Sequence, residues 1–237
     1  MTITKKRMKL GDVPVLLTYW DLEASKKNGT VIFYHGFTAK KELNIKEYER
    51  LAEQGYLVVG VDNYDHGERL HPDFKTVYAD GPTFELAFQN AIEKTSDELP
   101  FLIDALMEAN YIVNDKIALV GISMGGFITY SAITKEPRVK VAVPFIGSPV
   151  HGDNNPRSPH HNLGQFSGVK LLSLLAAKDD VVPPEDAVAF HENLKGHFAD
   201  DDERFKVVVY PESGHFMTAE EWEMAMDELF FWLNRHM

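Results

Sequence analysis

The chain has 237 residues, of which 24 are basic and 36 acidic, so its formal net charge is −12. This acidic balance argues against a nucleic acid partner, because binding to phosphates draws on clustered Lys and Arg. The absence of cysteine excludes disulfides, thiolate metal sites and a cysteine nucleophile. With 44% hydrophobic residues, a chain of this length can bury the core of one α/β domain, and we expect a single domain over residues 1–237.

The sequence does not predict a membrane segment. The basic run at residues 5–9 is followed by Gly, Asp and Pro rather than by the apolar stretch of a secretory signal. The apolar stretches at 139–146 and 171–177 fall far short of the roughly 18 residues that span a bilayer. We therefore expect a soluble, cytoplasmic protein with no membrane partner, and the sequence leaves a homodimer open.

Short β-branched runs alternate with longer stretches of helical period along the chain. This order is typical of an α/β fold with an eight-stranded, mostly parallel sheet and helices on both faces. The first two strands, 7–10 and 13–19, are joined by the hairpin signal Gly11-Asp12 and should form an antiparallel edge. Later strands are expected at 30–34, 57–61, 116–120, 139–145, 171–176 and 205–210, and helices at about 41–54, 83–109 with a break at Pro100, 126–135, 185–195 and 219–234.

The most informative motif is Gly121-Ile122-Ser123-Met124-Gly125, which stands between a predicted strand and a predicted helix. In a G-x-S-x-G motif the serine lies on a sharp, strained turn, and the flanking glycines allow strand and helix backbones to approach closely. This context favours Ser123 as a nucleophile over a simple glycine-rich turn.

A serine hydroxyl needs a base that removes its proton and a carboxylate that orients the base. His215, in a Ser-Gly-His turn after the last strand, is the candidate base, and Asp179 and Asp180 after strand 171–176 compete as the carboxylate. The other C-terminal histidines, on or beside helices, are expected to be solvated: His191, His197 and His236.

A tetrahedral intermediate also needs two N–H donors that face its oxyanion. The backbone N–H of Met124, directly after the nucleophile, is one candidate. The turn His35-Gly36-Phe37 after strand 30–34 supplies the other, the N–H of Phe37. His35, Tyr64 and His66 also follow predicted strand ends, and they are tentative residues of the substrate pocket.

These motifs occur in one order and together resemble a known fold. The segments His35-Gly36-Phe37, 62–67, 121–126, 179–183 and Ser213-Gly214-His215 resemble the α/β-hydrolase fold. Within it, the chain resembles small bacterial serine esterases related to the catalytic domain of prolyl oligopeptidases and to dienelactone hydrolases. Dienelactone hydrolases use a cysteine nucleophile, and prolyl oligopeptidases carry a β-propeller for which this chain has no room.

The resemblance also bears on the choice of the catalytic acid and on the role of residues 147–168. In similar sequences the catalytic acid stands four residues before a proline, here Pro183, which favours Asp179 over Asp180. Insertions after the sixth strand of such proteins often cap the pocket, so residues 147–168 are expected to form a small lid-like insertion.

No metal or cofactor is expected. The spacing of His151, Asp153, His160 and His161 matches no rigid metal-binding motif, and the chain contains neither the G-x-G-x-x-G nor the Walker phosphate-binding pattern.

The sequence therefore predicts a serine esterase, most specifically a carboxylesterase that cleaves small or short-chain esters through an acyl-enzyme. A thioesterase or an amidase or peptidase could use the same triad, and a non-catalytic ligand-binding protein on this fold is the alternative of another class. A dehalogenase is disfavoured, because its relatives need an Asp where Ser123 stands. The net charge of −12 favours a neutral substrate over a polyanionic one.

Overall fold

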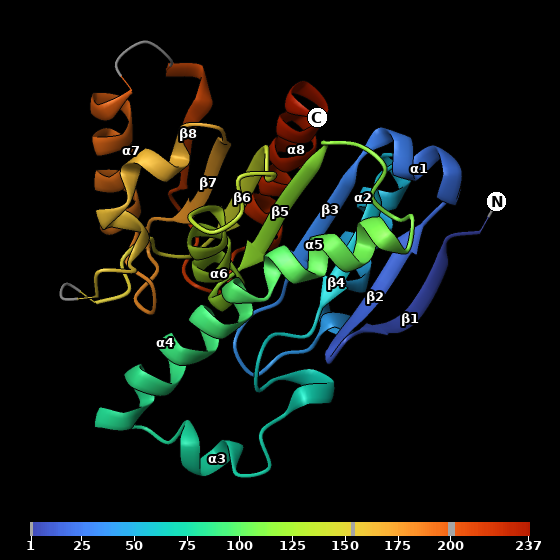
Figure 1. Cartoon of the computed structure of the whole chain (residues 1–237). Helices are drawn as coiled ribbons and strands as arrows, with labels where there is room; N and C mark the ends of the chain where they lie inside the picture. Colours follow the sequence, from blue (N-terminus) through green and yellow to red (C-terminus); the bar gives the residue numbers. More distant parts are fainter. Residues whose placement is uncertain (1, 153–154, 199–201) are drawn as a thin grey trace.

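The computed structural model describes residues 2–152, 155–198 and 202–237. Its centre is one eight-stranded sheet with the order β1-β2-β4-β3-β5-β6-β7-β8 (Figure 1). The pairs β1·β2 and β2·β4 are antiparallel, and the remaining pairs are parallel. The strands are β1 Thr4–Leu10, β2 Val13–Tyr19, β3 Thr30–Tyr34, β4 Leu57–Val61, β5 Ile117–Ile122, β6 Val141–Phe145, β7 Lys170–Ala176 and β8 Phe205–Tyr210. The predicted fold class, with its antiparallel N-terminal edge, is confirmed.

Helices cover both faces of the sheet. Side chains of α4, α5, α6 and α7 belong to the apolar cluster on one face, and side chains of α2 and α8 belong to the cluster on the other. Figure 1 shows α5 and α6 in front of the strands and α8 behind them. The helices are α1 Leu22–Asn28, α2 Ile45–Glu53, α3 Phe74–Val77, α4 Pro82–Asp97, α5 Leu99–Glu108, α6 Met124–Ile133, α7 Glu185–His197 and α8 Ala219–His236.

The sequence did not predict two short helices that the structure contains. The predicted break in the helical region near Pro100 is present. The short helices α1 and α3 have too few residues to show a helical period. Pro100 lies in the first turn of α5, where its missing N–H costs no intrahelical hydrogen bond.

The parallel register brings the predicted site segments to one edge of the sheet. Tyr34 at the end of β3 pairs with Gly121 in β5, so the loop that begins at His35 starts beside Ser123. Ala176 of β7 pairs with Tyr210 of β8, so the loops that carry Asp179 and His215 also start side by side. Open parallel sheets place their sites at this carboxyl edge.

The expectation that His191 is solvated is wrong. His191 is only 3% exposed, and its Nε2 lies 2.7 Å from the Ser173 hydroxyl, which in turn lies 2.5 Å from the Tyr130 hydroxyl. The buried residues of α7 at positions 187, 190, 191 and 194 follow a helical period, so His191 lies on the face that packs against the sheet. His197, at the end of the same helix, is exposed.

Burial of His191 predicts a pH-dependent stability. Burial lowers the pKa of His191 to about 3, and the unfolded chain should have an ordinary value of about 6.5. Between these values the unfolded state binds the extra proton, so the free energy of unfolding falls as the pH falls below about 6.5. The expected loss from this one group is up to about 1.4 kcal/mol per pH unit.

His191→Gln should reduce the slope of unfolding free energy against pH between pH 6.5 and 4, measured by denaturant titration. The exposed His197→Gln is the matched control and should leave the slope unchanged. An equal slope in both variants would contradict a neutral, buried His191.

Candidate active site

Ser123 lies on a strained turn between β5 and α6. Its φ of 55° and ψ of −117° lie in a region that non-glycine residues rarely adopt, and such strain is concentrated at functional sites. A Cβ on Gly121 would stand 2.0 Å from the carbonyl oxygen of Gly125, and a Cβ on Gly125 would stand 2.1 Å from that of Tyr34. Glycine is therefore required at both flanking positions for this turn to form.

The structure brings the three predicted triad side chains into one hydrogen-bonded row. Ser123 Oγ lies 2.9 Å from His215 Nε2, and His215 Nδ1 lies 2.8 Å from Asp179 Oδ2. The Asp179 side chain is 1% exposed, whereas that of His215 is 13% exposed and reaches the cavity described below. A carboxylate in this place holds the proton on Nδ1, which leaves Nε2 free to accept the serine proton.

The loop geometry distinguishes the two candidate carboxylates. Asp179 Oδ1 accepts hydrogen bonds from the N–H groups of Val181 at 3.0 Å and Val182 at 2.8 Å. The carboxylate is thus fixed by its own turn while its second oxygen faces His215. Asp180 is exposed. The N–H of Lys178 also donates to the carbonyl of Ser213 at 2.9 Å, which joins the loop of the acid to the loop of the base.

The two predicted oxyanion donors belong to segments that follow the neighbouring strands β3 and β5. Met124 is the first residue of α6, so its N–H has no intrahelical acceptor and lies at the positive end of the helix. Gly36, next to Phe37, comes so close that a Cβ there would lie 3.6 Å from Ser123 Cβ. Within the described ranges, the N–H groups of Phe37 and Met124 donate to no protein acceptor, which leaves both available to a ligand oxygen.

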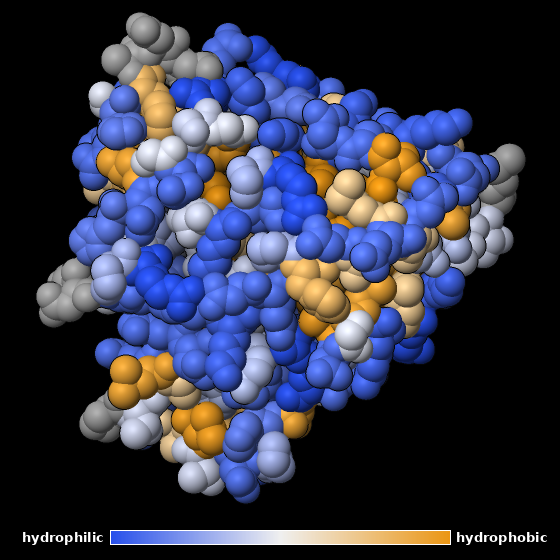
Figure 2. All heavy atoms as spheres, viewed as in Figure 1, coloured by the Kyte–Doolittle hydropathy of each residue, from blue (hydrophilic) through white to orange (hydrophobic). Residues whose placement is uncertain are grey.

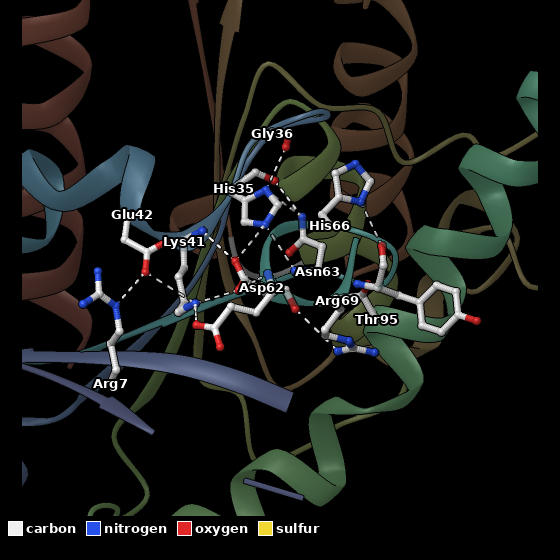
Figure 3. A network of polar contacts seen from close by, with 12 residues as sticks. Arg7, His35, Gly36, Lys41, Glu42, Asp62, Asn63, His66, Arg69 and Thr95 are labelled. Atoms are coloured by element: carbon white, nitrogen blue, oxygen red, sulfur yellow. Dashed lines mark hydrogen bonds and ion pairs between the residues drawn. The ribbon is translucent and has the colours of Figure 1, made fainter. Parts of the chain in front are cut away.

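A buried ionic network holds the loop that carries Phe37 (Figure 3). The Lys41 side chain has no exposed surface, and its ammonium lies 2.6 Å from Asp62 Oδ2 and 2.5 Å from Glu68 Oε1. Asp62, also fully buried, accepts the N–H of Lys41 through Oδ1 and the N–H of Glu68 through Oδ2. The loop after β3 is thereby fastened to the loop after β4.

The pKa values of the central pair follow from this arrangement. Burial alone would raise the pKa of Asp62, but the N–H groups and the ammonium of Lys41 outweigh it and hold the pKa below its ordinary value. Burial would likewise lower the pKa of Lys41, but its two carboxylate partners outweigh burial and raise it. Both groups are therefore charged at neutral pH.

The three tentative pocket residues need correction, because none of them lines the cavity. His35 is fully buried: its Nδ1–H donates to the carbonyl of Gly36, and its Nε2 accepts the N–H of Asn63. Burial lowers the pKa of His35 to about 4, so the ring is neutral. His66 is buried behind the ring of Phe37, 5.4 Å between centroids, and Tyr64 instead lies under the ammonium of Lys94. At a strand end only some side chains face the cavity, and those of His35, after β3, and of Tyr64 and His66, after β4, are not among them.

The cavity at Ser123 has a volume of about 1220 Å³. Its wall is mainly apolar and aromatic, and the triad serine and histidine are among the residues that line it. The lining residues are Gly36, Phe37, Thr38, Ala39, Lys40, Glu42, Leu43, Asn44, Gly67, Leu70, Phe84, Phe88, Ile122, Ser123, Phe127, Ile146, Val181, Val182, His215, Phe216, Met217 and Trp222.

The expected cap also needs correction, because no described residue of 147–168 lines this cavity. That segment packs against α6 and α4 instead. The ring of His151 lies 5.6 Å from that of Phe127 in α6, and Arg157 pairs with Asp97 of α4 at 2.6 Å. The cavity wall on this side comes from Phe84 and Phe88 of α4, a helix inserted between β4 and β5.

The considered metal cluster is not assembled among the described residues. Asp153 lies outside them, and no group of three or more His, Asp or Glu side chains in the described ranges could hold a metal ion. No helix in the described ranges is both long and apolar enough to cross a membrane.

The sheet order, the strained serine turn and the site at the carboxyl edge define an α/β hydrolase. A sequence profile of the dienelactone hydrolase family matches residues 18–228, so the chain belongs to this family. The chain is 28% identical to YitV of Bacillus subtilis (strain 168), over 75% of this chain and 79% of that protein. It is 29% identical to esterase YjfP of Escherichia coli (strain K12), over 78% of this chain and 82% of that protein. The crystal structure of TT1662 from Thermus thermophilus superposes with a TM-score of 0.80 at 22% identity, covering 98% of this chain and 99% of that one.

Family membership and the named esterase among its relatives show that the chain is a hydrolase of the esterase and dienelactone hydrolase group. The family profile also confirms the resemblance to dienelactone hydrolases inferred from the motifs.

Proposed function

We propose that this protein is a serine carboxylesterase that works through an acyl-enzyme on Ser123. The observation that carries the proposal is the continuous row from Ser123 Oγ to His215 Nε2 at 2.9 Å and from His215 Nδ1 to Asp179 Oδ2 at 2.8 Å. Each distance lies within the hydrogen-bond reach that a nucleophile and its base require. With no cysteine in the chain, a thiolate cannot replace the serine.

In the first half-reaction, Ser123 Oγ attacks the ester carbonyl carbon while its proton passes to His215 Nε2. The carbonyl oxygen becomes an oxyanion that accepts hydrogen bonds from the N–H groups of Phe37 and Met124. The C–O bond to the alcohol then breaks, and His215 returns the proton to the leaving oxygen. Asp179 stabilises the imidazolium that exists between these two transfers.

In the second half-reaction, a water molecule takes the place of the alcohol. His215 Nε2 accepts a proton from this water, whose oxygen attacks the acyl carbon, and the same oxyanion donors hold the second intermediate. Collapse of that intermediate returns the proton to Ser123 and releases the carboxylic acid. A thioester or anilide could enter the same cycle, so matched ester, thioester and anilide substrates decide which leaving group is preferred.

Ser123→Ala should abolish turnover of p-nitrophenyl butyrate and covalent labelling by a fluorophosphonate, because no other group takes over the attack. The exposed Ser167→Ala is the matched control and should retain both activities. Circular dichroism and thermal unfolding check that both variants fold. Undiminished turnover by a folded Ser123→Ala protein would refute the proposal.

A further inference from the structure

The cavity has apolar walls on both sides of Ser123. Phe88 and Phe127 belong to one wall, and both pack against the apolar cluster on the sheet face covered by α4 to α7. Met217 and Trp222 belong to the other wall, and both pack against the cluster on the face covered by α2 and α8. Ser123 follows the central strand β5 and therefore lies between two walls that come from opposite faces of the sheet.

The wall toward α4 is built from aromatic rings. Phe84 and Phe88, one turn apart on α4, stack with 5.7 Å between ring centroids, and each lies within 6 Å of the ring of Phe37. Phe127 meets Phe88 edge to face at 5.5 Å. These rings present a contiguous apolar surface close to the candidate oxyanion donor.

Apolar side chains also continue outward to the rim of the cavity. Phe216, the residue after His215, is 94% exposed, and Leu43, Leu70 and Val181 are each more than half exposed while lining the same cavity. In the view of Figure 2, hydrophobic residues lie at the surface near α3 and α4, and a larger group lies beside α5 and the N-terminal strands. A ligand that reaches the rim would bury side chains that are now in water.

The charged groups along this wall do not form a defined binding site for an anionic substrate group. Lys40 and Glu42 are the lysine and the acidic residue among the described lining residues. The Glu42 carboxylate already binds Arg7 at 3.0 Å and lies 3.5 Å from the ammonium of Lys41, while Lys40 is exposed at the rim. Among the described residues no arginine lines the cavity, so they offer no rigid bidentate donor to hold a substrate carboxylate.

From these observations we propose that the substrate is an uncharged ester with apolar groups on both the acyl and the alcohol side of the scissile bond. When an ester carbonyl lies at Ser123, its acyl group and its alcohol group extend in different directions. Here each of the two groups would contact an apolar wall. A volume of about 1220 Å³ exceeds what a short-chain ester fills and lies above the range typical of cavities that enclose drug-sized ligands, roughly 300–1,000 Å³. This inference rests on the proposed esterase function, because it concerns the same site.

Two substrate series test the inference. The first lengthens the acyl group, from p-nitrophenyl acetate to p-nitrophenyl hexanoate, and the second lengthens the alcohol, from methyl to hexyl butyrate followed by pH-stat. Each buried methylene can raise kcat/KM by up to about fourfold. We expect kcat/KM to rise at least about tenfold along both series, and to fall at least about tenfold when a terminal carboxylate replaces the end methyl of the longest member.

Two variants assign the walls. Phe84→Ala removes apolar surface from the α4 wall, and Met217→Ala removes it from the opposite wall. For each variant, the selectivity is the ratio of kcat/KM for the longest ester to that for the shortest ester of a series. Phe84→Ala should lower this ratio at least about fivefold in one series only, and Met217→Ala should lower it at least about fivefold in the other series only. Phe231→Ala, an exposed phenylalanine of α8 outside the cavity, should leave both ratios unchanged.

The outcomes separate this inference from the proposed function. Ratios that stay flat or fall with chain length, or an equal loss in both series for each variant, would overturn the inference while leaving a Ser123-dependent esterase intact. Faster turnover of the carboxylate-bearing ester would also overturn it. Failure to hydrolyse any ester would instead refute the proposed function.

Discussion

Asp179→Asn is expected to lower kcat for ester hydrolysis by roughly 10⁴-fold, the effect expected when the orienting carboxylate of such a triad becomes an amide. The Oδ1 atom of Asp179 is fixed by the N–H groups of Val181 and Val182. The amide oxygen of the substituted side chain would keep those bonds, and its NH₂ group would then face His215 Nδ1. That arrangement favours the tautomer with the proton on Nε2, which cannot accept the serine proton.

The neighbouring Asp180→Asn provides a matched control, because it removes the same charge at an exposed position one residue away. It should change kcat by less than about threefold, since an exposed charge is well screened. Steady-state kinetics with p-nitrophenyl butyrate compares the two. A larger loss in Asp180→Asn than in Asp179→Asn would assign the acid to the other position.

Lys41→Met is expected to lower the free energy of unfolding by about 3–5 kcal/mol, the cost typical of removing one partner from a buried ion pair. The methionine fills most of the same space but leaves the fully buried Asp62 carboxylate without its ammonium. The remaining N–H bonds to Asp62 satisfy part of the charge, so we expect a folded but weakened protein. Chemical denaturation monitored by circular dichroism measures the change.

Lys40→Met is the control for this change, because its side chain is exposed and the two residues are adjacent in sequence. It should alter the free energy of unfolding by no more than about 0.5 kcal/mol. If Lys41→Met were as stable as Lys40→Met, the network would not hold the loop that carries Phe37.

The sheet and the triad were predictable because their signals are local. Buried parallel strands require nearly continuous apolar runs, and a serine turn of this kind requires Gly121 and Gly125 for the steric reason that the structure shows. The order of the motifs then placed Ser123, the two candidate acids and the loop of His215 after β5, β7 and β8, respectively. The choice of Asp179 depended on resemblance, because both aspartates have the same local context.

The buried charges were harder to predict, although a signal for them exists. Lys41 precedes α2, and the buried positions 41, 44, 48 and 51 follow the helical spacing of three or four residues. Lys41 therefore lies on the inward face of this segment, whereas Lys40 does not. His191 also lies at a buried position of the helical period, on α7. For Lys41 and His191 alike, the residue type suggests a solvated side chain, whereas the helical period indicates a buried one.

The cavity wall could not be derived from the sequence, because it depends on how two insertions pack. Residues 147–168 and the α3–α4 region both follow strands at the edge that carries the site. The first insertion packs against α6 and α4, through His151 and Arg157, respectively. In the second insertion, Phe84 and Phe88 line the cavity at Ser123. Only the three-dimensional arrangement shows which insertion faces the substrate.

The most direct test of the central claim is to identify the residue that carries the acyl group. Treatment with p-nitrophenyl dimethylcarbamate should release one equivalent of p-nitrophenol per chain and leave a slowly hydrolysed carbamoyl group. Peptide mass spectrometry should then find that group on Ser123, in an amount that matches the loss of esterase activity. Complete inactivation with the carbamoyl group on any other residue, or with Ser123 unmodified, would contradict the account.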